Sequence, residues 1–292
     1  MNIALVVNPF ASRVTDERVH KVAAELARAG DVTTLLTERP QHATELVSET
    51  MADAVVVFSG DGGYNEALNG LEGETPIGFL PGGGTSVLPR ALGLPHDAVA
   101  AARQVADALA NGRTRRITVG RANGRRFAFS AGVGLDAAAV RHVDHMGRSR
   151  DGKRPGDMAF ALAVVRVLAA ERLHLEPALE VKGLGRAACA FVANAQPYTY
   201  AKRVPLPIAP EARFELGLDL VAPVRIRRRS LVRTAYSILA GRPRDGMLYA
   251  HDADGFEIVC DRPLPLQVDG EDLGDVERAE LVAERGAVAV LV

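Results

Sequence analysis

The segment FSGDGGYNEALNGL, residues Phe58–Leu71, decides the fold. It begins at the end of a short apolar run, Ala54–Phe58, and ends in a stretch with helical periodicity. A strand, a glycine-rich turn and a helix in succession are typical of an α/β unit, which binds its ligand at the carboxyl end of a parallel strand. The segment therefore predicts a ligand-binding loop at Ser59–Tyr64.

The residue types in this loop indicate phosphate chemistry. Gly60, Gly62 and Gly63 allow positive φ angles and let backbone N–H groups approach an anion without interference from a Cβ atom. The helix expected to begin near Tyr64 would direct its positive end to the same place. Asp61 between the glycines indicates a Mg²⁺ ion or a substrate hydroxyl beside a nucleotide. A plain strand-to-helix turn also favours Asp and Gly, and it stays the alternative.

A second glycine cluster, LPGGGTSVLPRALGLP (Leu80–Pro95), comes directly after the predicted strand Ile77–Leu80. It offers bare backbone donors and a hydroxyl, suited to phosphate or ribose, at Gly82, Gly83, Gly84 and Thr85. Neither loop is a Walker A loop, because GxxxxGK[ST] is absent, and neither fits the dinucleotide pattern GxGxxG. Two such loops on one sheet favour a nucleotide site over two structural turns.

The pattern of the chain changes near residues 111–121. Residues 1–116 alternate strand and helix patterns, which predicts a parallel, Rossmann-like sheet with helices on both faces. Residues 117–292 read as many short strands with helical insertions, which predicts a β-sandwich domain. Its strands near the end are expected at Phe256–Cys260, Leu264–Val268, Arg278–Val282 and Val288–Val292.

Composition excludes several classes of protein. The chain has 292 residues, 48% of them hydrophobic and 24% charged, as in a globular protein with room for two domains. A net charge of −1 gives no overall attraction to nucleic acid. Cys189 and Cys260 fit neither a zinc site nor a disulfide framework. We expect a cytoplasmic protein, because neither a leader sequence nor a membrane-spanning run is evident.

Further motifs follow in order along the chain: Asn8-Pro9, Thr37, the Gly-Asp-Gly loop with Asn65-Glu66, Pro81–Thr85, Gly134–Ala137 and Asp269-Gly270-Glu271. Together they resemble the diacylglycerol kinase catalytic-domain family, which includes bacterial lipid kinases and sphingosine kinases. The resemblance implies an ATP-binding α/β domain at residues 1–116, of the kind shared with NAD kinase. It also implies a β-sandwich substrate domain at residues 117–292, facing the first across a catalytic cleft. The implied reaction is ATP-dependent phosphorylation of a diacylglycerol-like or sphingoid lipid, with Mg²⁺ accompanying ATP.

The resemblance also implies roles for single residues. Nucleotide contacts are expected from Asn8, Pro9, Thr37, Gly60, Asp61, Gly62, Gly63, Asn65, Gly83, Gly84 and Thr85. We assign Asp61 to the metal of Mg·ATP. Glu271 is assigned to accepting the proton of the lipid hydroxyl, as in the bacterial members. In the sphingosine kinase branch the aspartate of the Gly-Asp-Gly loop is the favoured base, so Asp61 stays the alternative.

Three positions depart from the family pattern. Gly63 stands where a threonine is common, and Val87-Leu88 where many members carry Asn-Asp. Leu216 replaces a carboxylate that helps bacterial relatives to hold a structural Mg²⁺, and an apolar side chain cannot coordinate a hard cation. We therefore expect no second metal site, with Glu215 and Asp219 left open as partial substitutes.

Two other functions remain open on sequence, an NAD kinase-like enzyme and a nucleotide-binding regulator without transfer activity. Basic clusters at Arg148–Arg154 and Arg225–Arg233, the latter extended by Arg242 and Arg244, read either as solvated faces or as contacts with anionic lipid headgroups. The second interpretation gives transient, peripheral contact with the inner membrane surface. Whether the chain forms a homodimer is also left open.

Overall fold

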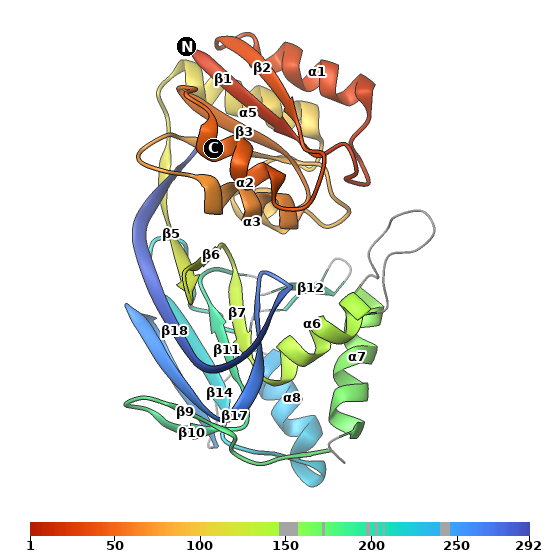
Figure 1. Ribbon diagram of the computed structural model, residues 1–292, viewed down its shortest axis with the longest axis vertical. Helices are drawn as coiled ribbons and strands as arrows, with labels where there is room; N and C mark the ends of the chain where they lie inside the picture. The colour runs from red at the N-terminus through yellow and green to blue at the C-terminus, as the bar shows by residue number, and fades with distance from the viewer. Residues whose placement is uncertain (146–156, 171–172, 197–198, 202–203, 207, 240–245) are drawn as a thin grey trace. The chain divides into compact units, whose positions relative to one another are not determined.

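The structure is a computed structural model of residues 1–292, and it describes all of them except 146–156, 171–172, 197–198, 202–203, 207 and 240–245 (Figure 1). The chain divides into two compact units. Unit 1 comprises Met1–Ile117 together with Gly286–Val292, and unit 2 comprises Thr118–Arg285. The sequence predicted a second domain of residues 117–292, which includes Gly286–Val292. In the structure these residues return to unit 1, where Val290 pairs in parallel with Ile77.

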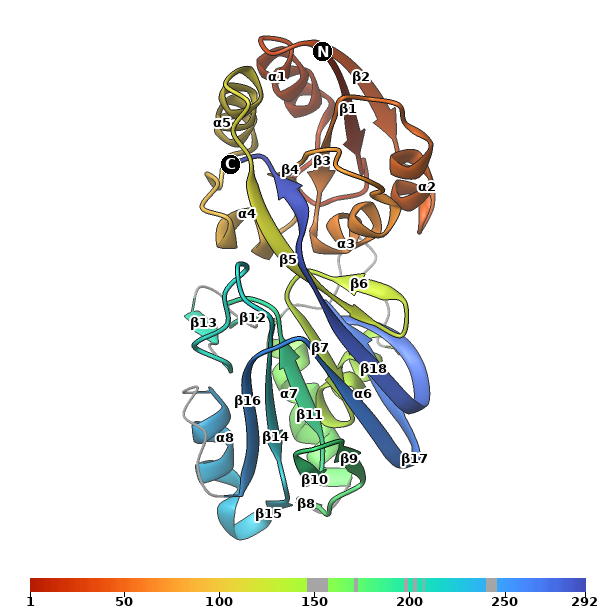
Figure 2. The ribbon, with the colours of Figure 1, turned by 90° about the vertical axis from the view of Figure 1, so that its left-hand side faces the viewer.

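Unit 1 is a parallel sheet between two layers of helices. Its elements are β1 (Asn2–Val7), α1 (Asp16–Leu26), β2 (Asp31–Leu36), α2 (His42–Glu49), β3 (Ala54–Ser59), α3 (Asp61–Gly70), β4 (Ile77–Pro81), α4 (Val87–Ala91) and α5 (Ala98–Ala110). The strands lie in the order β4-β3-β1-β2, and each neighbouring pair is parallel. Figure 2 shows α1 and α5 on one face of this sheet and α2 and α3 on the other.

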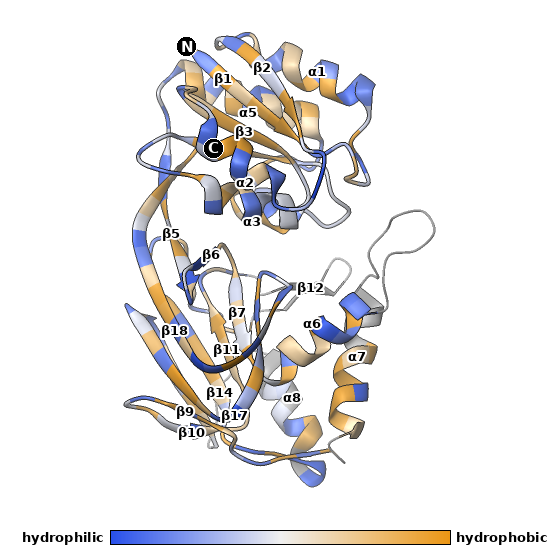
Figure 3. Cartoon of the chain, viewed as in Figure 1, coloured by the Kyte–Doolittle hydropathy of each residue, from blue (hydrophilic) through white to orange (hydrophobic). Residues whose placement is uncertain are grey.

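Burial in unit 1 follows from covering both faces of the sheet. All residues of β3, and all of β1 after Asn2, are buried, as expected of central strands whose two sides both meet helices. Leu5 and Val56 pack with Val22 of α1 in one apolar cluster. Figure 3 shows the matching concentration of hydrophobic residues along β1 and β3. The sheet is therefore a rigid base for the loops at its strand ends.

Unit 2 is rich in antiparallel strands. Its first elements are β5 (Arg115–Ala122), β6 (Arg125–Phe127), β7 (Ser130–Val133), α6 (Leu135–His145) and α7 (Asp157–Ala170). The next are β8 (His174–Leu175), β9 (Leu179–Val181), β10 (Gly185–Ala187), β11 (Ala190–Ala193), β12 (Thr199–Ala201) and β13 (Val204–Leu206). The remainder are β14 (Leu218–Pro223), β15 (Ile226–Arg227), the 3₁₀ turn η1 (Arg228–Ser230), α8 (Leu231–Leu239), β16 (Met247–Ala253), β17 (Gly255–Val268) and β18 (Glu271–Val290). The main path is β16-β14-β11-β7-β17-β18, and its neighbouring strands are antiparallel.

The predicted fold class, an α/β region followed by a strand-rich region with helical insertions, is confirmed. Four short strands expected near the end of the chain are instead parts of β17 and β18. The sequence suggested a break at the proline-containing stretch before Leu264. A β-bulge between Val259 and Leu264 absorbs that irregularity, so β17 continues through it. Within the described part of the chain, no helix is long and apolar enough to cross a bilayer.

Candidate active site

The first glycine loop is shorter than the sequence suggests. α3 begins at Asp61, and Gly60 is its N-cap with an extended backbone. The positive φ angles that Gly60, Gly62 and Gly63 allow are not used, because none of the three has a positive φ in the structure. The start expected near Tyr64 is wrong. Glycine disfavours helix interiors, so a reading by propensity places the helix start after the glycines.

These glycines provide space rather than unusual backbone angles. A Cβ atom on Gly63 would lie 2.1 Å from Ser59 Oγ, and one on Gly82 would lie 2.8 Å from the Ser59 carbonyl oxygen. A Cβ on Gly83 would lie 2.9 Å from the Cα of Gly60. The two loops that follow the neighbouring strands β3 and β4 therefore meet backbone to backbone, and glycine is required for this contact.

The carboxylate of Asp61 links the two loops by hydrogen bonds. Its Oδ1 accepts hydrogen bonds from the backbone N–H groups of Val87 at 2.7 Å and Leu88 at 3.3 Å, at the start of α4. Val87 and Leu88, which depart from the family pattern, thus hydrogen-bond to Asp61 through their backbone N–H groups. The carboxylate lies just beyond the carboxyl end of β3, where an open parallel sheet binds its ligand.

The buried side chain of Tyr64 links the ends of β3 and β4. Its hydroxyl lies 2.6 Å from the carbonyl oxygen of Ser59 and 2.7 Å from that of Leu80, at the ends of β3 and β4. Burial raises the pKa of this hydroxyl, and the charge of Asp61 adds to the effect. Tyr64 stays a neutral donor, and the strand ends that carry both loops are held in fixed register.

The structure separates the predicted nucleotide contacts into exposed and internal residues. Gly62, Gly84 and Pro9 are exposed, and Asn8 and Thr85 are partly buried. Asn8 Oδ1 accepts from the N–H of Phe10 at 2.9 Å and shapes the turn after β1. The N–H groups of Gly82 and Gly83 are already bonded, to the Ser59 carbonyl and to Ser86 Oγ.

Two of the predicted contacts face the interior of unit 1. Thr37 is 7% exposed and its N–H donates to the Val7 carbonyl. Asn65 is 1% exposed, and its Oδ1 accepts from Asn69 Nδ2 at 3.2 Å. The neighbouring Glu66 accepts from the Ala43 N–H at the start of α2. The first turn of α3, with Asp61 and Gly62, is therefore the better candidate for contact with phosphate.

In unit 2, the Asp-Gly-Glu motif forms the tight turn between β17 and β18. Val268 pairs with Glu271, so Asp269 and Gly270 are the two turn residues, with φ angles of 47° and 81°. Positive φ at both positions is the geometry of a type I′ hairpin. The Asp269 carboxylate accepts three backbone N–H groups, from Ala128 at 2.7 Å, Phe129 at 2.8 Å and Ser130 at 3.1 Å. Asp269 is thus the structural residue of the motif.

Glu271 lies beside this turn with its carboxylate partly buried. Its Oε2 pairs with Arg125 Nη2 of β6 at 2.9 Å, and the two side chains are 27% and 21% exposed. The next residue, Asp272, receives a bidentate pair from Arg141 of α6 at 2.7 and 3.0 Å. This bond lowers the pKa of the Asp272 carboxyl. The carboxylates of the hairpin are therefore oriented by arginines from other elements.

A buried amide connects the hairpin to the Gly134–Ala137 motif. Gln267 Oε1 accepts from the Gly270 N–H at 2.8 Å, and Gln267 Nε2 donates to Asp136 Oδ2 at 3.0 Å. Asp136 is 4% exposed. Two motifs that are more than a hundred residues apart thus belong to one hydrogen-bonded framework. Sequence reasoning missed Gln267, Arg125 and Arg141, because their partners are distant in sequence and no local pattern marks them.

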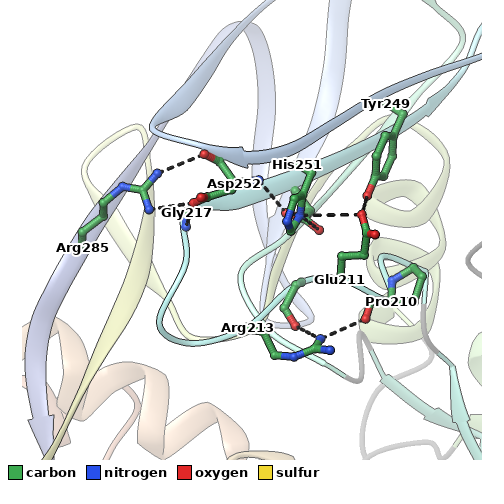
Figure 4. A network of polar contacts seen from close by, with 10 residues as sticks. Pro210, Glu211, Arg213, Gly217, Tyr249, His251, Asp252 and Arg285 are labelled. Carbon is green, nitrogen blue, oxygen red and sulfur yellow. Dashed lines mark hydrogen bonds and ion pairs between the residues drawn. The ribbon is translucent and has the colours of Figure 1, made fainter.

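The residues around Leu216 do not fit a structural Mg²⁺ site (Figure 4). Asp219 is fully buried, and its two oxygens lie 2.9 and 3.0 Å from His251 Nδ1. Asp252 Oδ1 accepts from the Gly217 N–H and from Arg285 Nη1, each at 2.7 Å. The bond to Asp219 raises the pKa of His251. The Asp219 and Asp252 carboxylates are therefore already bonded to an imidazole and a guanidinium.

The arginine is packed closely against this loop. A Cβ on Gly217 would lie 2.6 Å from Arg285 Nη2. Among the residues that the structure describes, no group of three or more His, Cys, Asp and Glu side chains is arranged to hold a metal ion. The absence of a second metal stays a prediction, and the arrangement of Arg285 and His251 supports it.

Comparison with known proteins agrees with the motifs. Residues 2–122 match the family model of the diacylglycerol kinase catalytic domain. The diacylglycerol kinase of Bacillus subtilis (strain 168) is 31% identical over 138 residues, which are 44% of this chain and 45% of that protein. The chain thus matches less than half the length of this curated relative.

Solved structures with the same fold span nearly the whole chain. A crystal structure of a diacylglycerol kinase from Bacillus anthracis str. Sterne superposes with a TM-score of 0.72 at 19% identity, covering 99% of this chain and 96% of that one. An NAD kinase from Archaeoglobus fulgidus, in complex with ATP, gives a TM-score of 0.55 at 16% identity, covering 99% and 93%. At these identities the likeness establishes the fold, and it includes both units.

Proposed function

We propose that this chain, whose residues 2–122 match the model of the diacylglycerol kinase catalytic domain, transfers the γ-phosphate of ATP to a hydroxyl of a diacylglycerol-like or sphingoid lipid. The observation that carries the proposal is the contact of two glycine loops at the carboxyl ends of β3 and β4, with Asp61 bonded across them. The bonds to Val87 and Leu88 would also fit a structural turn. What favours the proposal is the position of the Asp61 carboxylate at the strand ends beside both glycine loops, because phosphoryl transfer needs a carboxylate beside Mg·ATP.

In the proposed reaction, Mg²⁺ and ATP enter together as substrate. The first turn of α3 supplies backbone N–H groups and a positive helix end to the phosphates, and Asp61 holds the metal. Gly82 and Gly83 keep the two loops in contact, and side chains there would separate them. The loop residues thus position the γ-phosphate and offset its charge, which is the main demand of this chemistry.

The second carboxylate has a separate task. As the lipid oxygen forms its bond to the γ-phosphorus, Glu271 accepts the hydroxyl proton, and the bond to the β–γ bridging oxygen breaks to release ADP. Arg125 fixes the orientation of the Glu271 carboxylate through the 2.9 Å ion pair. This division gives each carboxylate one role, and Asp61 as the base is the alternative that mutagenesis must exclude.

Labelled ATP tests the proposal directly. The purified protein is incubated with γ-labelled ATP, Mg²⁺ and a total lipid extract, and the products are separated by thin-layer chromatography. Parallel reactions contain diacylglycerol, sphingosine or NAD as the single acceptor. We expect label in a lipid product. Label on NAD alone, or no consumption of ATP with any acceptor, would contradict the proposal. A cytoplasmic enzyme in transient contact with an anionic membrane surface is part of this proposal.

A further inference from the structure

Apart from the proposed site, the segment RIRRRSLVRTAYSIL, Arg225–Leu239, carries the most unusual surface of unit 2. It forms β15, η1 and α8 (Figure 1). The segment contains five arginines and no acidic residue. The other basic cluster, Arg148–Arg154, and the flanking Arg242 and Arg244 fall in or touch the ranges 146–156 and 240–245, outside the described residues.

One side of this segment anchors it to unit 2. Ile226 is 2% exposed, and Leu231 packs against the apolar cluster that includes Leu168 and Phe191. Ser237 of α8 is 2% exposed. Arg225 Nε lies 2.9 Å from Glu176 Oε2, so the arginine at the base of the segment already has an acidic partner. The orientation of α8 is therefore fixed.

The opposite side of α8 is both apolar and basic. Val232 is 84% exposed and Tyr236 is 54% exposed, one helical turn apart. Arg233 of α8 and Arg229 of the preceding turn η1 are exposed as well. For these two arginines, the described part of the chain offers no ion pair or side-chain hydrogen bond. Apolar and cationic side chains thus alternate on one outward stripe.

We infer that this outward stripe of α8 binds an anionic lipid surface, with Val232 and Tyr236 at the acyl-chain boundary and Arg229 and Arg233 at the lipid phosphates. The inference rests on the proposed function only in that a lipid substrate resides at such a surface. An acidic protein or a nucleic acid would match the arginines but would not account for the exposed apolar side chain of Val232. Aliphatic and aromatic side chains flanked by arginine are the composition of helices that lie in the membrane interface.

The chain contains no tryptophan, which gives a direct probe of insertion. Tyr236→Trp creates a single fluorophore on the stripe, and Met51→Trp creates one at a residue of unit 1 that is 95% exposed. With vesicles of phosphatidylcholine and phosphatidylglycerol, we expect a blue shift of the emission for Tyr236→Trp and none for Met51→Trp. Equal behaviour of the two variants would overturn the inference.

Vesicle sedimentation measures the contribution of charge. Each basic residue near an anionic surface is worth about a fivefold change in partitioning, so Arg229→Ala with Arg233→Ala should weaken binding about 25-fold. The matched control is Arg113→Ala, an exposed arginine of unit 1. Val232→Ser should weaken binding on the order of tenfold. Three results would refute the lipid-binding role of the stripe. They are unchanged binding in these variants, an equal loss in the control, and equal binding to neutral vesicles.

The two proposals fail separately. Vesicle binding is measured without ATP, so binding is read without catalysis. Activity is read on a short-chain, water-soluble diacylglycerol, for which the stripe variants should match wild type. Loss of vesicle binding with no kinase activity in any protein would sink the proposed function and leave the inference standing. If the stripe variants bound vesicles normally and the wild-type protein phosphorylated a lipid, the inference would be refuted and the proposed function would stand.

Discussion

The Gly-Asp-Gly turn of unit 1 and the Asp-Gly-Glu turn of unit 2 use the same residue types for different physical purposes. In the first, neither Gly60 nor Gly83 has a positive φ angle, and glycine is needed at Gly83 because its backbone touches that of Gly60. In the second, Gly270 has a φ of 81°, and nothing lies within 4 Å of the position that its Cβ would take. Glycine is therefore needed in the first motif because a side chain would not fit, and in the second because the backbone takes a positive φ angle.

The aspartates of the two motifs differ in the same way. Asp61 is bonded through Oδ1 to two N–H groups of the neighbouring loop, at the edge of a candidate ligand site. Asp269 accepts three N–H groups within the framework of its own unit. The comparison teaches that a shared Asp-Gly motif does not indicate a shared role. Replacing the two aspartates should separate catalysis from stability.

Asp61→Asn should have the largest effect. The amide oxygen can still accept from Val87, but the charge that holds Mg²⁺ is lost. We expect transfer to fall on the order of 10³-fold or more, while the free energy of unfolding changes by about 1 kcal/mol. Turnover is measured by coupled release of ADP, and stability by urea unfolding. A variant with near-normal turnover would remove Asp61 from the site.

Glu271→Gln tests the second half of the comparison. The amide keeps the size of the side chain but cannot take up a proton at neutral pH, so kcat should fall about 10²- to 10⁴-fold. The KM for ATP and the unfolding midpoint should stay near wild type. Arg125→Met is the companion variant, since it removes the orienting partner and leaves the carboxylate. Normal turnover of Glu271→Gln would assign the base to Asp61.

Asp269→Asn should act on stability. An amide offers one acceptor oxygen where the carboxylate accepts three N–H groups, so the change should cost about 2 kcal/mol of unfolding free energy. Urea unfolding of Asp269→Asn and Asp61→Asn under the same conditions gives the contrast. If Asp61→Asn were the less stable of the two, the structural and catalytic aspartates would have been assigned the wrong way round.

The glycines give a finer contrast. Gly83→Ala must push Gly60 away, because the new Cβ would lie 2.9 Å from its Cα, and we expect the KM for ATP to rise about tenfold. Gly270→Ala meets open space and should only lose about 1 kcal/mol through its positive φ. Nucleotide titration and thermal unfolding of both variants test the distinction between space and rotation. Equal ATP affinities would argue against the contact of the loops as part of the site.

The smallest expected effect is that of Mg²⁺ on the nucleotide-free protein. A structural cation at a hundred times its Kd would add about 2.7 kcal/mol and several degrees to Tm. With Arg285 and His251 around Asp219 and Asp252, we expect a Tm shift below about 1 °C. Thermal scans with Mg²⁺ and with a chelator check this. A shift of several degrees would point to a cation site that this chain has kept.

Sequence periodicity was sufficient for the alternation of strands and helices in unit 1, because its central strands are short, apolar and bounded by loops. It was insufficient at Asp61–Gly63, where Gly63 occupies the first turn of α3 because the side chain of Ser59, at the end of β3, leaves no room for a Cβ atom. That constraint comes from side-chain packing at the strand-to-helix turn, which hydrophobic periodicity does not record. The same is true of Arg125 and Gln267, whose partners are set by the pairing of distant strands.

The site was predictable as far as its motifs extend. Asp61 and Glu271 were found from glycine spacing and family resemblance, and the structure places them in distinct hydrogen-bonded settings. Asn65 and Thr37 carry the right residue types for ligand contact but face the interior. Burial of a polar residue depends on which face of its element meets the core, and a short polar stretch does not reveal that face.

The passage of β18 into unit 1 has a consequence for how the protein is made. Val290 pairs with Ile77, the N–H of Leu291 donates to the Ile77 carbonyl, and the Leu291 side chain is 1% exposed. During synthesis on the ribosome, the edge of β4 stays unpaired until all of unit 2 has been synthesised and this segment follows. An unpaired strand edge invites pairing with other chains, so this interval exposes the nascent protein to aggregation. A fragment that ends at Ile117 would keep that edge open permanently.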